Sequence, residues 1–108
     1  MELRNYTPHP VIVISDDGRV VATYPVQGPI PRVKEIVVPD RHIDGVLVNK
    51  VSYDEEVTDL PAPEKGVLLI VSRITAGAVS GRDDLFFPHG EVRDEVGRIV
   101  GVRALGRF

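Results

Sequence analysis

The run Val67-Leu68-Leu69-Ile70-Val71 is the most apolar stretch of the chain, and it constrains the fold more than any other feature. Consecutive apolar residues that follow a glycine, here Gly66, are typical of a strand buried on both faces. The run is far shorter than the ~20 apolar residues of a membrane-spanning helix. We therefore expect residues 67–71 to form the central strand of a soluble core.

Two further segments have the sequence pattern of a β-hairpin. The β-branched run 11–14 is followed by the turn residues Ser15-Asp16-Asp17-Gly18, and residues 19–24 return as a second β-prone stretch. Residues 94–97 repeat this turn chemistry before the β-prone stretch 98–103. Two hairpins with similar turns explain the similarity between these segments better than a sequence duplication does. We therefore predict two hairpins.

Proline and glycine divide the remainder of the chain into shorter segments. Val46 and Val48 lie two residues apart along one of them, and these two and Val51 are expected to face the core. The predicted segments are a surface loop over 25–31, a strand over 32–38, a turn over 39–45, a strand over 46–51, an exposed acidic connection around 54–56, and a short strand over 85–87 that Pro88-His89-Gly90 stops.

One short helix is expected directly after the central strand. Ser72 is a suitable N-cap, and Ile74, Ala78 and Val79 have helical spacing. Together these elements predict an α+β fold in a single domain of residues 1–108. Its sheet is expected to be mostly antiparallel, or a partly open small barrel, with one short helix near residues 72–80.

The composition excludes several classes of function. The chain is 43% hydrophobic and 27% charged, which is the balance of a chain that folds. Its net charge of −3 argues against nucleic acid as a partner, because such binding depends on neutralising many phosphates. The absence of cysteine excludes disulfides, thiolate zinc sites and a cysteine nucleophile. We expect a cytoplasmic protein without a membrane segment, and a homo-oligomer that buries strand edges.

Familiar catalytic motifs are absent. The chain contains no Gly-x-Ser-x-Gly elbow, no Gly-x-Gly-x-x-Gly loop and no Walker lysine loop. Its histidines, His9, His42 and His89, have none of the spacings that place two ligands on one element. We therefore predict no metal site, no cofactor and no catalytic residue.

All six basic residues after Ser72 are arginines, which suit phosphate or carboxylate groups because their guanidinium is planar and bidentate. Ser72 and Arg73 would form an anion site if helix amides and a guanidinium lie together. The alternative is that these arginines pair with the carboxylates nearby, in a surface network of little energetic weight. The arginines are Arg73, Arg82, Arg93, Arg98, Arg103 and Arg107.

The opening Thr7-Pro8-His9-Pro10-Val11 and later landmarks resemble a family of small uncharacterised proteins from bacteriophages and actinobacterial genomes. The later landmarks are Ser72-Arg73, Arg82-Asp83-Asp84-Leu85, Val92-Arg93-Asp94-Glu95 and Gly97-Arg98. The resemblance spans most of the chain but implies no established activity. Val102 stands where many such sequences have cysteine, and residues 53–57 are atypical. Small phage proteins without catalytic motifs often act by binding, including by sequestering nucleotide-derived immune signals, which would place this chain in the host cytoplasm.

Three functions follow as hypotheses. The first is a non-enzymatic protein that sequesters a phosphate-bearing nucleotide signal. The second is an interaction module that binds a host or phage protein through a strand edge or the acidic loop around Asp54. The third is a small hydrolase that uses His9 or His89 with a carboxylate. The residues predicted to contact the ligand of the first are Tyr6, Thr7, His9, Ser72, Arg73, Arg82, Asp84 and Arg93.

Overall fold

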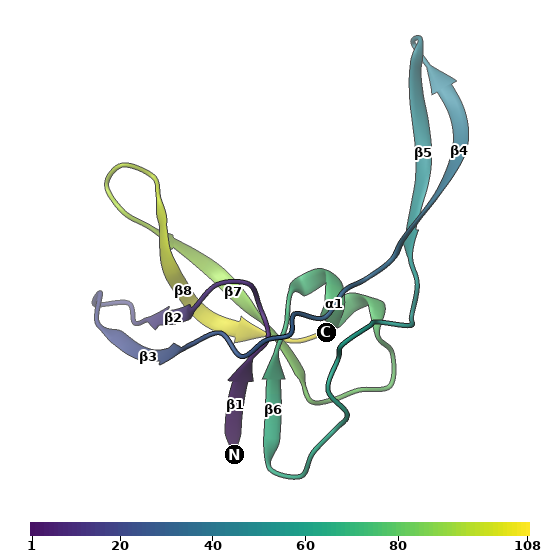
Figure 1. The fold of residues 1–108 in the computed structure, drawn as a ribbon. Coiled ribbons are helices and arrows are strands. Elements are labelled where there is room, and N and C mark those ends of the chain that lie inside the picture. Colours follow the sequence, from purple (N-terminus) through teal and green to yellow (C-terminus); the bar gives the residue numbers. More distant parts are fainter.

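The computed structural model describes residues 1–108 and contains eight strands and one helix (Figure 1). The predicted α+β fold with one short helix is confirmed. The elements are β1 (Glu2–Asn5), β2 (Val11–Ile14), β3 (Val20–Tyr24), β4 (Glu35–Ile43), β5 (Val46–Tyr53), β6 (Val67–Ile70), α1 (Arg73–Ala78), β7 (Leu85–Arg93) and β8 (Ile99–Gly106).

Six of the strands form one mixed sheet in the order β1-β6-β7-β8-β2-β3. β6 pairs in parallel with both β1 and β7, and β2 meets β8 in parallel at Val13 and Val102. The β2–β3 and β7–β8 pairs are antiparallel hairpins. Strands β4 and β5 form a separate two-stranded sheet.

The apolar run at residues 67–71 supplies the core, as predicted. Ile70 and Val71 are fully buried, and successive side chains of an extended segment point to opposite faces. Leu69 and Val71 pack with Ala76 of α1 and with Phe87 in one cluster. Ile70 packs with Val11 and Val102 in a second cluster. β6 therefore joins two small cores, one on each side of the sheet.

Both predicted hairpins are present, but the prediction that Pro88 stops a short strand was wrong. β7 continues through Pro88 and Gly90 to Arg93 and pairs with β8 along this length. Its pairing with β6 ends at Phe86, so Pro88 lies where β7 has a neighbouring strand on one side only. A proline without an N–H donor is tolerated at such an edge.

Ser72 is the N-cap of α1, as predicted. Its Oγ accepts a hydrogen bond from the Thr75 amide at 3.1 Å, the N-cap contact that satisfies a free donor of the first turn. Thr75 and Ala76 are the buried residues of α1. The helix ends at Ala78 and is only six residues long.

The segment 35–53 corrects the prediction most strongly. Residues 39–43 belong to β4 instead of a turn, and the reversal is confined to Asp44 and Gly45, which both have positive φ. Such a two-residue turn matches the twist of a hairpin. β4 and β5 project from the rest of the molecule as a long hairpin (Figure 1), which we call the arm. Val46 and Val51, expected to face the core, are exposed there, and Val48 is half-buried.

No helix in the structure is both long and apolar enough to cross a membrane.

Candidate functional site

A network around Asn5 shapes the segment 5–10. The Asn5 side chain is fully buried, and its Nδ2 donates to the carbonyl oxygens of His9 at 2.8 Å and Tyr24 at 2.9 Å. Its Oδ1 accepts from the Thr7 amide at 2.8 Å and lies 2.7 Å from Thr7 Oγ1. Asn5 thus ties β1 to the end of β3 and holds the loop that carries His9. The sequence analysis did not identify this role of Asn5.

A pocket of about 580 Å³ brings together three of the predicted ligand residues, Thr7, His9 and Ser72. Glu91 of β7 lines the same pocket. Prolines of the 5–10 loop and of β7, together with residues of β2 and β8, supply its remaining walls: Pro8, Pro10, Pro88, Val11, Ile12, Ile99, Val100, Gly101 and Val102. The pocket therefore has apolar walls with a few polar groups, which is the usual composition of a small-molecule site.

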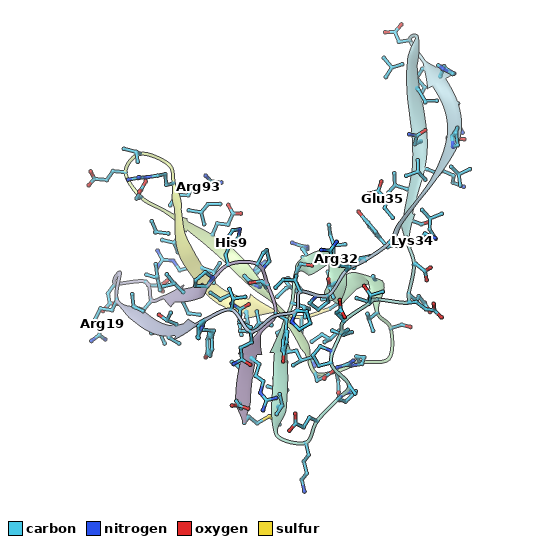
Figure 2. The ribbon with its side chains drawn as sticks, viewed as in Figure 1. His9, Arg19, Arg32, Lys34, Glu35 and Arg93 are labelled. Atoms are coloured by element: carbon cyan, nitrogen blue, oxygen red, sulfur yellow. The ribbon has the colours of Figure 1, made fainter.

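No arginine or lysine lines this pocket, and Glu91 is its one carboxylate. Arg93 lies farther along the β7–β8 hairpin, where it pairs with Glu91 at 3.0 Å and donates to the Gly97 carbonyl oxygen at 2.7 Å. Figure 2 shows Arg93 on that hairpin, well away from Arg32. His9 and Glu91, which share the pocket, are the histidine and carboxylate that the hydrolase hypothesis needs, and that hypothesis stays a prediction.

Arg82 and Asp84 form an ion pair with each other and do not line the pocket of Thr7, His9 and Ser72. Arg82 Nε lies 2.8 Å from Asp84 Oδ1, and its Nη2 lies 2.7 Å from Asp84 Oδ2 and 3.0 Å from the Pro61 carbonyl oxygen. Both side chains are largely buried. The hydrogen bonds from Arg82 hold the pKa of the Asp84 carboxyl below its usual value, against the opposing effect of burial. This pair fastens the loop before β6 to the loop before β7.

Arg73 and Tyr6 also lie outside the pocket. The Arg73 guanidinium carbon is 5.4 Å from the ring centre of Phe87 and 5.7 Å from that of Phe108, within cation–π distance. Tyr6 packs against the core cluster of Leu69 and Phe87. The eight predicted ligand residues therefore divide into a pocket group of three, the Arg82–Asp84 ion pair, Arg93 with its own ion pair to Glu91, and the two aromatic contacts of Arg73 and Tyr6.

The arm is a second candidate site, and sequence reasoning missed it. Every residue of β4 is exposed, and every residue of β5 except Val48. Seven large aliphatic residues and one tyrosine are among them: Ile36, Val37, Val38, Ile43, Val46, Leu47, Val51 and Tyr53. The available signal was the high apolar content of both strands, but that pattern also fits a strand packed on the core.

A groove of about 770 Å³ lies at the base of the arm. Asp54, Glu55 and Glu56 line it, and none of them forms an ion pair. Arg32 and Lys34 line it too, and Figure 2 shows Lys34 and Glu35 where the chain enters the arm. The groove thus has mixed charge, with the apolar side chains of Leu60 and Val79 in its wall.

No group of three or more histidine or acidic residues is arranged to hold a metal ion. Comparisons with protein-family models, with curated proteins and with solved structures found no match to the chain.

Proposed function

We propose that the protein is a non-enzymatic interaction module that binds another protein chain through the β4–β5 arm. The observation that carries this proposal is that every residue of β4 and every residue of β5 except Val48 is exposed, although eight of these exposed residues are large and apolar. Exposed apolar patches beyond a few hundred Å² are rare on monomers and mark interaction sites.

The uncovered faces and unpaired edges of the arm support the same function. A two-stranded hairpin alone is marginally stable in water, because it lacks a third strand or a helix to cover it. Both strands of the arm also have an outer edge with unpaired backbone groups, since the second sheet contains only β4 and β5. A bound protein would cover the apolar side chains and pair these edges, which is the β-strand addition used by many recognition modules.

Site-specific photocrosslinking in the expressing cell tests the proposal. A photoreactive phenylalanine analogue replaces Leu47 on the arm, and a matched probe replaces Val96 in the β7–β8 turn, which is also exposed and apolar. We expect a protein adduct from the arm probe only, identified by mass spectrometry. A Val51→Lys substitution in the same chain should abolish that adduct, because it places a charge in the middle of the arm.

The control distinguishes binding from random collision. Equal adducts from the arm and turn probes, or an arm adduct that survives Val51→Lys, would contradict an interaction through the arm. The absence of any protein adduct from Leu47 would do the same.

A second candidate function is the binding of a phosphate-bearing small molecule, such as an ADP-ribose or cyclic-nucleotide signal, in the pocket of Thr7, His9 and Ser72. Its volume of about 580 Å³ favours this candidate, since sites for small molecules measure about 300–1,000 Å³. The His9 ring would contact the base. Arg93 is the one predicted arginine whose ion-pair partner lines the pocket, and it would meet a phosphate at the rim.

Calorimetric titration with ADP-ribose and a cyclic dinucleotide tests the second candidate. Binding of one of them should weaken at least tenfold in His9→Ala, and should be unchanged in Arg19→Ala, an exposed arginine at the far end of β2–β3 (Figure 2). A ligand recovered chemically unchanged would favour sequestration over hydrolysis. Both compounds are rejected as ligands if neither gives binding heat at a concentration of about 1 mM, which would detect dissociation constants up to about that value.

A further inference from the structure

The register of the arm divides its side chains between two faces. Residues opposite each other in an antiparallel pair point to the same face, and successive pairs alternate. One face, which we call the tyrosine face, consists of the cross-strand pairs Glu35–Tyr53, Val37–Val51, Pro39–Asn49 and His42–Leu47. The other, which we call the lysine face, consists of Ile36–Ser52, Val38–Lys50, Arg41–Val48 and Ile43–Val46.

The two faces differ in charge. The tyrosine face has no lysine, arginine or aspartate, and its titratable groups other than the Tyr53 phenol are Glu35 at the base and His42 near the tip. The lysine face carries Lys50 and Arg41, and Arg41 pairs with Asp40 at 3.1 Å on the same strand. Each face has five apolar residues, so the two faces differ in the sign and placement of their charged groups and not in apolar content.

The tyrosine face is complementary to itself under a two-fold rotation. When two copies lie antiparallel, the order of the four pairs in one copy is reversed in the other. Glu35 of each arm then meets His42 of the other arm, and Tyr53 meets Leu47. Val37 and Val51 meet Pro39 and Asn49. The two Glu35 carboxylates lie at opposite ends of the contact, so each carboxylate meets an imidazole and the two carboxylates do not meet each other.

We propose that the occupant of this face is a second copy of the chain, so that two arms pack antiparallel, tyrosine face on tyrosine face, about a two-fold axis. This inference rests on the proposed interaction function of the arm and names its partner. Identical surfaces that meet around a two-fold axis form the commonest kind of oligomer interface. The symmetric placement of Glu35 and His42 is what selects a second copy over an unrelated protein.

The area of the tyrosine face limits how tightly two arms can bind each other. Eight residues at about 3.4 Å each, in two strands about 4.8 Å apart, make a ribbon about 27 Å long and about 10 Å wide. A stable interface buries about 800 Å² on each partner, which is more than one such face supplies. The dimer is therefore weak and reversible, and its population depends on the protein concentration.

Sedimentation velocity on the full chain across a range of concentrations tests the proposal, from about 5 µM to about 1 mM, where weak dimers populate. We expect a shift from monomer to dimer in the wild type. Val51→Lys, on the tyrosine face, should weaken the dimer at least tenfold. Val38→Lys, on the lysine face, is the matched control because the two valines are 52% and 53% exposed, and it should leave the dimer intact.

A charge exchange tests the antiparallel arrangement itself. Glu35→Lys and His42→Glu should each weaken the dimer, and the double variant should restore it because the lysine at position 35 of each arm then meets the glutamate at position 42 of the other. A wild type that stays monomeric throughout, or equal weakening by Val51→Lys and Val38→Lys, would overturn the proposal. If the crosslinked partner of Leu47 is then a different protein, the interaction function stands while the second copy is excluded.

Discussion

Val37 and Val51 face each other across the middle of the arm, and each is about half exposed, at 47% and 52%. Their aliphatic surfaces contact each other but no core, because none of the buried residues of the chain lies in β4 or β5. Only 14 of the 108 residues are buried, and none of these lies in the arm. The six-stranded sheet and α1, which we call the body, fold around β6. The arm extends from the body as a surface for contact.

Asn5→Ala should destabilise the body strongly. The substitution removes the acceptor of the Thr7 amide and the donor to the Tyr24 carbonyl oxygen, while the His9 carbonyl oxygen keeps only its hydrogen bond from Thr7 Oγ1. We expect the free energy of unfolding to fall by about 3 kcal/mol, because each unsatisfied buried group costs about 1–3 kcal/mol. Urea unfolding measures the change. Thr7→Ser keeps the hydroxyl and should cost about 1 kcal/mol at most, the value of one methyl group. Equal effects of the two substitutions would contradict the network.

Stability should depend on pH through Asp84. Its pKa is lower in the folded state, below the ordinary 3.8, mainly because Arg82 donates hydrogen bonds to the carboxylate. Such a group stabilises the fold above its unfolded pKa and loses this contribution as the pH falls through the folded pKa. Asp84→Asn should therefore cost about 2 kcal/mol near neutral pH, in the range of a hydrogen bond between charged groups.

The difference between wild type and Asp84→Asn should narrow as the pH falls from about 5 to about 2, where the native carboxyl takes up its proton. Urea unfolding at several pH values measures this. Asp83→Asn is the control, since Asp83 is the exposed neighbour and forms no ion pair, and its stability near neutral pH should match that of the wild type. A constant difference across the pH range would show that the ion pair does not stabilise the fold.

Two glycine-to-alanine substitutions should have opposite effects. A Cβ at Gly101 would lie 2.6 Å from the Ile12 carbonyl oxygen and 2.7 Å from Ile14 Cδ1, so β8 could not keep its contact with β2. We expect a loss of about 2–3 kcal/mol from this overpacking. A Cβ at Gly77 in the helix meets only the exposed Phe108 ring at 3.3 Å, which can move. Gly77→Ala should therefore stabilise by about 0.5 kcal/mol. Thermal unfolding of both variants checks the signs.

Local signals in the sequence predicted much of the body. The Asp-Gly turn after β2, the N-cap at Ser72 and the apolar run of β6 act within a few residues, so their outcomes do not depend on distant packing. Pro88 was misread because a proline is excluded from a strand only where both sides are paired, and sequence does not reveal which strands have open edges. The mixed pairing of the sheet arises from contacts between distant segments.

The candidate sites were harder to predict for the same reason. Thr7 and His9 lie in the pocket because the buried Asn5 holds their loop, whereas Ser72 reaches it from the end of β6. Arg82 has a partner two residues away, which the sequence did suggest as an alternative. The exposure of Val46 and Val51 was unpredictable from periodicity, because alternation identifies the faces of a strand but not what covers them.

Replacing the arm should leave the body folded. Glu35 and Tyr53 are cross-strand partners, so residues 36–52 can be exchanged for the two-residue turn Asn-Gly, which suits a tight hairpin. The removed segment contributes no buried residue, so the free energy of unfolding should change by less than about 1 kcal/mol. The urea m-value should also stay nearly constant, because it scales with the surface that unfolding exposes. The shortened chain should sediment as a monomer at all concentrations. A large loss of stability would instead mean that the arm folds as part of the body, and its exposed valines would then need a structural explanation within a single chain.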